Sequence, residues 1–166
     1  MANMMASAPK RILLAEDDPE GVELTLAALA EAGLADEVET VTDGQEVLDY
    51  LYRRGQYQDR EPGNPAVILL DLKMPRVTGL EALEQIRNDA ALSTVPVAVL
   101  TSSTEESDLA ACYRLRANAY VVKPVDFGEF LDAVKKLGSF WAKLNEPPFG
   151  SVPRRTTERP QSSSEH

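Results

Sequence analysis

The sequence predicts an α/β fold, a (βα)5 doubly wound five-stranded parallel sheet. Three observations indicate this class: short runs rich in Val, Ile and Leu recur, amphipathic stretches with helical spacing separate them, and capping residues precede the helices. Strands of a parallel sheet are buried on both faces, which explains why three runs are almost continuously apolar. We expect strands at residues 11–15, 38–41, 67–70, 95–100 and 119–122.

Helix starts agree with this pattern. Side-chain oxygens that can cap free backbone N–H groups precede four of the amphipathic stretches. These candidate caps are Asp43, Thr78, Ser103 or Thr104, and Asp126.

The 166 residues fit one domain with a tail. We expect the folded domain at residues 10–145, after a flexible N-terminus at residues 1–9. Residues 53–65 form a polar insertion that is longer than a usual connection between helix and strand, and we expect a surface loop there. Residues 146–166 are rich in Pro, Ser, Thr and Arg and lack apolar periodicity, which predicts a flexible tail.

Composition excludes several classes of function. The chain has 27 acidic and 17 basic residues and a net charge of −10, which argues against binding to nucleic acid. No apolar run approaches the roughly 20 residues that span a bilayer, and no signal peptide is evident, so we expect a cytoplasmic protein without membrane contact. The single cysteine, Cys112, and the single histidine, His166, argue against disulfide, zinc and Ser-His-Asp chemistry.

Polar side chains stand where four of the expected strands end. In an open parallel sheet, ligands bind outside the carboxyl ends of the strands, so these side chains should converge in one shallow pocket. The residues are Glu16, Asp17, Asp18, Asp71, Thr101, Ser102 and Lys123. Taken singly, each has an ordinary structural explanation, since an Asp or Thr can cap a helix and a Lys can be a solvated charge. Their coincidence at one edge favours a functional site.

The chemistry of this set is specific. Clustered carboxylates repel one another and attract a cation, and an all-oxygen site suits Mg²⁺. With Mg²⁺ held by Asp17 and Asp71, one oxygen of Asp71 stays free to attack a phosphorus atom, while Lys123 neutralises charge on the phosphoryl group. The added negative charge should then draw the hydroxyl of Thr101 inward.

Four segments carry a family resemblance: ILLAEDD, ILLDLKMPRVTGLEAL, VAVLTSS and ANAYVVKP. With them, residues 10–145 resemble the receiver domain of two-component response regulators, and the spacings of Thr101 and Lys123 after Asp71 also fit. The resemblance implies a flavodoxin-like receiver fold in which Asp71 accepts a phosphoryl group from a sensor histidine kinase. Such a chain is a signalling protein that catalyses only its own phosphorylation and dephosphorylation.

The resemblance also implies roles for other residues. It places Glu16 and Asp17 in the acidic pocket with Mg²⁺ and makes the main-chain carbonyl of Lys73 a further metal ligand. It assigns the phosphoryl contacts to Thr101, Ser102 and Lys123, and the switch pair to Thr101 and Tyr120. Many members have Asp-Asp where this chain has Glu-Asp followed by Asp18, so the relative roles of Glu16 and Asp18 stay open.

The long insertion, the TSS segment and the closing SFWAKL resemble single-domain regulators paired with bacterial and cyanobacterial phytochromes. This implies a light-sensing kinase as phosphodonor, such as a bacteriophytochrome, and a homodimer through the fourth and fifth helices and the fifth strand. We expect Tyr113 and Leu115 on the readout or dimer surface.

Three alternatives compete with this interpretation. An aspartate-nucleophile phosphohydrolase needs a second Asp two positions after the nucleophile, where this chain has Lys73. A receiver-like module that binds partners without phosphorylation needs none of the acceptor set. A flavodoxin-like nucleotide binder is disfavoured because the first loop, EDDPE, would repel phosphate.

Overall fold

Residues 8–154 are described by the computed structural model of the chain. Five parallel strands form one sheet in the order β2-β1-β3-β4-β5, which confirms the expected fold class. The strands are β1 (Ile12–Ala15), β2 (Val38–Val41), β3 (Val67–Leu70), β4 (Val97–Thr101) and β5 (Ala119–Val122). The main helices are α1 (Pro19–Glu31), α2 (Gly44–Tyr52), α3 (Gly79–Asn88), α4 (Glu106–Arg114) and α5 (Phe127–Ser139). Short helical turns lie at Ala35–Glu37 and Gly55–Tyr57, and a π-helix at Phe140–Leu144 continues α5.

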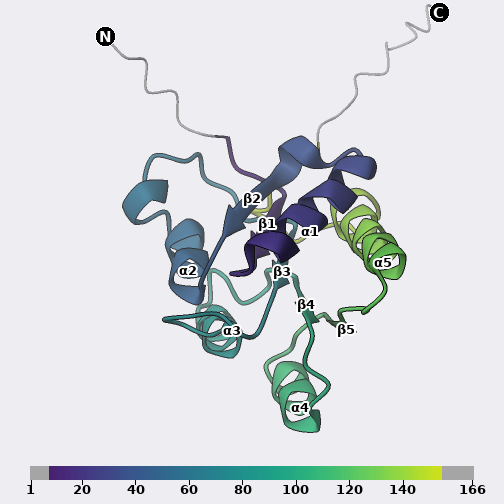
Figure 1. Ribbon diagram of the computed structural model, residues 1–166. Helices are drawn as coiled ribbons and strands as arrows, with labels where there is room; N and C mark the ends of the chain where they lie inside the picture. The colour runs from purple at the N-terminus through teal and green to yellow at the C-terminus, as the bar shows by residue number, and fades with distance from the viewer. Residues whose placement is uncertain (1–7, 155–166) are drawn as a thin grey trace, which may run out of the picture.

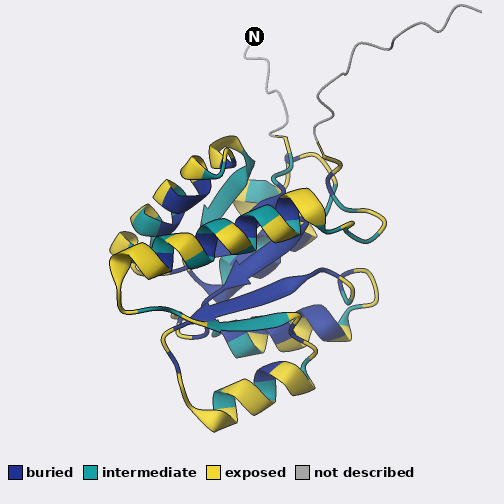
Figure 2. Ribbon diagram, turned by 90° about the vertical axis from the view of Figure 1, so that its right-hand side faces the viewer, coloured by how far each residue is buried: buried dark blue, intermediate teal, exposed yellow. Residues whose placement is uncertain are grey.

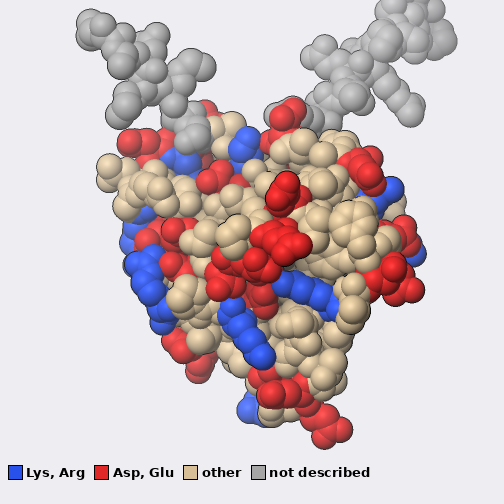
Figure 3. Space-filling view, in the orientation of Figure 1, with Lys and Arg blue, Asp and Glu red and all other residues tan. Residues whose placement is uncertain are grey.

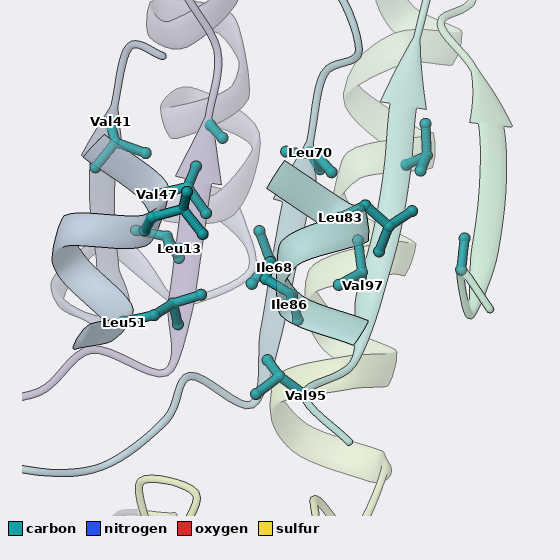
Figure 4. Packing of buried hydrophobic residues seen from close by; sticks show 14 of the residues in the cluster. Leu13, Val41, Val47, Leu51, Ile68, Leu70, Leu83, Ile86, Val95 and Val97 are labelled. Carbon is teal, nitrogen blue, oxygen red and sulfur yellow. The ribbon is translucent and has the colours of Figure 1, made fainter. Parts of the chain in front are cut away.

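The sheet lies between two helical layers (Figure 1). Helices α1 and α5 cover one face, and α2, α3 and α4 cover the other. Successive side chains of a strand point to opposite faces. Leu13 and Ile68 therefore join the core with α2 and α3, as Figure 4 shows, whereas Ile12 and Leu69 join the core with α1 and α5.

Four strands start and end within one residue of the expected positions, and β4 differs for a physical reason. It begins at Val97 rather than at residue 95, and it includes Thr101. Pro96 has no N–H to donate to a neighbouring strand and contributes only its carbonyl, which accepts from the Ile68 N–H at 2.9 Å. The longer carboxyl end brings Thr101 into the sheet, completely buried.

The capping predictions succeed for three helices. Asp43, Thr78 and Asp126 accept hydrogen bonds from backbone N–H groups at the starts of α2, α3 and α5. The prediction of Ser103 or Thr104 for α4 was wrong, because Glu105 occupies the N-cap position and its side chain makes no capping bond.

The insertion at residues 53–65 lies mostly at the surface, as expected, but Arg60 fastens it. The Arg60 side chain is 3% exposed and stacks on the ring of Tyr50, 4.1 Å from the ring centroid. Its guanidinium donates to the carbonyls of Tyr50, Glu61 and Gly63. The interior of the loop is therefore filled by a hydrogen-bonded guanidinium group rather than by an apolar cluster.

Residues 146–154, the start of the expected flexible tail, pack against the domain. Val152 is buried, its N–H donates to the Asn64 carbonyl, and the Asn64 N–H donates to the Gly150 carbonyl. The buried guanidinium of Arg11 donates to the carbonyls of Ala142 and Val152. Residues 155–166, and residues 1–7 of the expected flexible N-terminus, lie outside the described part of the chain.

Exposure is uneven among the helices. Helix α4 shows mostly exposed and intermediate residues and stands away from the other helices (Figure 2). Leu115, expected at the surface, is half-buried and packs against the core. Among the helices that the structure describes, none is both long and apolar enough to cross a membrane.

Candidate phosphoryl and metal site

Three site residues are fixed by hydrogen bonds that extend the sheet just past its strands. The Glu16 N–H donates to the carbonyl of Val41 at 3.0 Å, and the Asp71 N–H donates to the carbonyl of Ala15 at 3.0 Å. The Lys123 N–H donates to the carbonyl of Thr101 at 2.7 Å. The backbone thus places a glutamate, an aspartate and a lysine at one edge of the sheet, as the topology rule predicts.

The side chains of this edge form one cluster. Carboxylate oxygens of Glu16, Asp17 and Asp71 lie within 4.8 Å of one another. The ammonium of Lys123 lies 2.5 Å from Glu16 Oε2 and 2.9 Å from Asp71 Oδ2. In Figure 3, acidic atoms gather near the start of α1 with basic side chains beside them. Three carboxylates facing one ammonium leave an excess of negative charge that favours a further cation.

Burial and pairing shift the pKa values of this cluster. Burial raises the pKa of Glu16, and the bond from Lys123 opposes that effect without cancelling it. Burial alone would lower the pKa of Lys123, but its bonds with Glu16 and Asp71 outweigh burial, and the pKa is raised. Lys123 therefore stays protonated and serves as a permanent positive charge at neutral pH.

The loop after β3 approaches two helix starts closely. A Cβ on Gly79 would lie 2.2 Å from the Asp71 carbonyl oxygen, and one on Gly44 would lie 2.3 Å from the Val77 carbonyl oxygen. Glycine is required at both positions because these contacts leave no space for a side chain. Arg76, with a φ of 63°, adds an ion pair of 2.6 Å to Asp43, so the loop that contains Lys73 is held from both sides.

Asp18 and Glu16 have different surroundings. Asp18 caps α1 by accepting from the Glu20 N–H, and Pro19 occupies the first turn. Glu16 instead points into the cluster and is 4% exposed. The Asp-Pro pair at a helix start was the signal that could have separated these roles from the sequence.

Ser103 connects the expected switch residues. Its N–H donates to Thr101 Oγ1 at 3.3 Å, and its carbonyl accepts from the Tyr120 hydroxyl at 3.0 Å. Within residues 8–154, no direct hydrogen bond joins Thr101 to Tyr120. Sequence reasoning regarded Ser103 mainly as a helix cap and missed this connecting role. Ser102 is exposed at the rim of the site.

The chain matches the response regulator receiver domain family over residues 12–135. It belongs to this family. The resemblance inferred from the strand-end residues is thereby confirmed, together with the flavodoxin-like receiver fold.

Other response regulators are similar to this chain in sequence and in structure. Response regulator Rcp1 of Synechocystis sp. is 34% identical over 133 residues, which cover 80% of this chain and 89% of Rcp1. The Mn²⁺-bound structure of Rcp1 is similar with a TM-score of 0.77 and 33% identity, over 84% of this chain and 99% of that chain.

Two further solved structures extend this group. The phosphorylated cyanobacterial phytochrome response regulator RcpA has a TM-score of 0.77 and 36% identity, over 84% of this chain and 99% of that chain. The bacteriophytochrome response regulator RtBRR is 56% identical with a TM-score of 0.67, over 89% of this chain and 87% of that chain. The receiver described here therefore has phytochrome response regulators among its similar structures.

Proposed function

We propose that this receiver accepts a phosphoryl group on Asp71 from a sensor histidine kinase and signals through a change of shape. The observation that carries the proposal is the ion pair of 2.9 Å between Asp71 and Lys123 inside a cluster of carboxylates. This arrangement supplies a nucleophile together with a cation that can stabilise the negative charge of the phosphoryl group. Such a protein is a signalling domain that catalyses only its own phosphorylation and dephosphorylation.

We assign a Mg²⁺ site to Asp17, Asp71 and the main-chain carbonyl of Lys73, with Glu16 in the same pocket. The cluster fits this ion because its carboxylate oxygens converge within 4.8 Å and Asp17 remains exposed to solvent. When bound, Mg²⁺ would neutralise and orient the oxygens of the transferring phosphoryl group. The Mn²⁺-bound form of Rcp1 supports a divalent cation in a relative.

The transfer step uses the chain's own groups. One Asp71 carboxylate oxygen attacks the phosphorus of a phosphohistidine, a P–O bond forms, and the P–N bond breaks with its electron pair returning to the imidazole. Lys123 then holds a phosphoryl oxygen. Because Thr101 Oγ1 accepts from Ser103, its own O–H can donate to the phosphoryl group, and Ser102 supplies a second hydroxyl.

Thr101 and Tyr120 form the proposed switch pair. Movement of Thr101 toward the phosphoryl group pulls on the Ser103 N–H, and the Ser103 carbonyl is the acceptor of the Tyr120 hydroxyl. A shift at one end therefore changes the hydrogen bond at the other. This biases the position of Tyr120 beside α4 and β5.

We propose a bacteriophytochrome or related phytochrome kinase as phosphodonor and the cytoplasm as the location. The support comes from RtBRR and RcpA, which are phytochrome response regulators. Phosphotransfer assays that pair the purified chain with a phytochrome kinase and with an unrelated histidine kinase test this. Faster transfer from the phytochrome kinase is expected, and equal rates would count against the assignment.

We also propose a homodimer through the face formed by α4, β5 and α5. Leu109, Tyr113 and Val122 expose apolar surface there, at 40%, 56% and 42%. Sedimentation of the wild type and of Tyr113→Asp tests this face. A dimer that becomes a monomer in the variant is expected, and identical masses would rule out a dimer held by Tyr113.

The experiment for the acceptor role is gel mobility on a phosphate-binding gel after incubation with acetyl phosphate, with and without Mg²⁺. The wild type should shift only with Mg²⁺, and Asp71→Asn should not shift. Asp18→Asn is a matched control because Asp18 caps α1, and it should still shift. No shift in the wild type would favour the phosphorylation-independent binding module.

A further inference from the structure

Helix α4 is attached to the domain by few apolar side chains. Of its nine residues only Cys112 is buried, and Leu109 and Tyr113 point large apolar groups toward solvent. Figures 1 and 2 both show the helix apart from the other helices. A helix with so little buried apolar surface depends strongly on its polar contacts for its position.

The main polar contact of α4 is made by Asp108. Its Oδ2 accepts a hydrogen bond of 2.6 Å from the hydroxyl of Ser103, which is 5% exposed. The same hydroxyl accepts from the Glu105 N–H at 3.3 Å. A bond from a buried hydroxyl to a carboxylate is charge-assisted and stronger than a neutral bond. Asp108 therefore fastens the first turn of α4 to the loop that follows β4.

The backbone of Ser103 continues this connection into the site. Its N–H contacts Thr101 Oγ1 and its carbonyl contacts the Tyr120 hydroxyl. A displacement of Ser103 would therefore move both switch residues. Side chain and backbone of this one residue link α4, β4 and β5.

We propose that Asp108 is a positioning residue for the phosphoryl site, acting through Ser103, so that the position of α4 sets the lifetime of the phosphoryl group. This inference rests on the proposed acceptor role of Asp71. With the Ser103–Asp108 bond intact, the loop holds Thr101 beside the phosphoryl group and limits the access of water. Without it, water attacks phosphorus more often, the P–O bond to Asp71 breaks, and inorganic phosphate leaves as the carboxylate is restored.

The connection works in both directions. If the phosphoryl state changes the position of α4, then a partner protein that prefers one position of α4 shifts the equilibrium between the phosphorylated and unphosphorylated states by the same factor. A protein that binds Leu109 and Tyr113 and preserves the Asp108 bond would lengthen the lifetime. The output surface would thus control the duration of its own signal.

The test measures first-order loss of the phosphoryl group from the full chain after acetyl phosphate is removed. Asp108→Ala should shorten the lifetime by roughly threefold to tenfold, the scale of coupling between contacting residues. Asp108→Asn keeps a side-chain acceptor for Ser103 and should restore most of the lifetime. Glu106→Ala is the matched control, because it removes a carboxylate from the same helical turn without touching Ser103, and it should match the wild type.

A double-mutant cycle shows whether Asp108 acts through Ser103. Adding Asp108→Ala to Ser103→Ala should change the lifetime no further. A full additional effect in the double variant, or equal lifetimes for Asp108→Ala and the wild type, would overturn the inference. A general loss of folding would shorten the Asp108→Asn lifetime as well, so rescue by that variant separates positioning from structural damage.

Amide hydrogen exchange distinguishes failure of this inference from failure of the acceptor role. In the unphosphorylated chain, Asp108→Ala should accelerate exchange at the Ser103 N–H, whereas Glu106→Ala should not. Unchanged exchange at Ser103 overturns the connection and leaves the acceptor role intact. A wild-type chain that takes no phosphoryl group refutes the acceptor role first, and the lifetime role of Asp108 with it.

Discussion

The two edges of the sheet hold buried charge in different ways. At the carboxyl edge, Lys123 bonds to Glu16 and Asp71, so these three charged side chains satisfy one another. At the amino edge, buried guanidinium groups donate mainly to main-chain carbonyls of the surrounding helix ends, loops and C-terminal segment. These are Arg11, Arg60 and Arg87.

This difference determines at which edge the charged side chains can exchange their bonding partners. A main-chain carbonyl is fixed by the fold, so an arginine bonded to it fastens a loop permanently. A carboxylate paired with an ammonium can exchange that partner for a metal ion or a phosphoryl group with little backbone movement. We therefore expect the amino edge to contribute stability and the carboxyl edge to carry out the proposed phosphoryl chemistry.

The largest expected effect is at Arg87. It donates to the carbonyls of Val95 and Arg116 at 2.8 and 2.9 Å and also contacts Asn118. Arg87→Ala leaves several buried carbonyls without a donor and should lower the free energy of unfolding by about 3 kcal/mol or more. Urea denaturation measures this. The exposed Arg114→Ala is the control, and an equally small change in both variants would contradict the stabilising role of the amino edge.

Lys123→Ala should reduce the rate of phosphorylation strongly and the folding stability only slightly. Loss of the cation beside Asp71 should slow phosphorylation by acetyl phosphate by roughly 100-fold, the usual cost of removing one preorganised charge-stabilising group. The loss of folding stability should be smaller than for Arg87→Ala, since Glu16 can take up a proton. The exposed Lys136→Ala serves as control in both assays. Normal phosphorylation of Lys123→Ala would contradict the role of the carboxyl edge in stabilising the phosphoryl charge.

The C-terminal segment, residues 146–154, contributes to the stability of the amino edge. A chain that ends at residue 145 loses the buried Val152 and one acceptor of Arg11. Thermal and urea unfolding should show a loss of about 2 kcal/mol. The rate of phosphorylation should be unchanged. A chain that ends at Arg154 is the control and should match the full chain, whereas equal stability of all three chains would show that the segment contributes nothing.

The smallest effect concerns a buried group that belongs to neither edge. Burial, helped by the charge of Asp108, raises the pKa of the Cys112 thiol to about 11. The unfolded chain therefore loses this proton first as the pH rises, and the free energy of unfolding should fall between pH 9 and 11, roughly. Comparison with Cys112→Ala isolates the thiol from tyrosines that titrate nearby. Identical pH slopes for the two chains would contradict the shift.

The sequence was sufficient to predict the fold and the convergence of Glu16, Asp17, Asp71 and Lys123 at one edge of the sheet. Apolar runs, caps such as Asp43 and Thr78, and the topology rule predicted which residues meet at the carboxyl edge. These signals are local or depend only on strand order. The relative roles of Glu16 and Asp18 were left open, although the Asp-Pro pair at the start of α1 already indicates Asp18 as the cap, a role that its bond from the Glu20 N–H confirms.

The amino edge was largely invisible to sequence patterns. A buried arginine reads as a surface charge, because nothing local shows that distant carbonyls will satisfy it. Arg11 is bonded to Val152, which is 141 positions away. The same reason concealed the packing of residues 146–154, whose composition is typical of a flexible tail.

Reductive trapping determines whether Asp71 itself carries the phosphoryl group. Borohydride reduces an aspartyl phosphate to homoserine, which peptide mass spectrometry locates. If Asp71 is the acceptor, we expect homoserine at position 71 alone after treatment with acetyl phosphate and Mg²⁺, and none without the donor. A reduced side chain at Glu16, Asp17 or Asp18, with Asp71 unmodified, would contradict it.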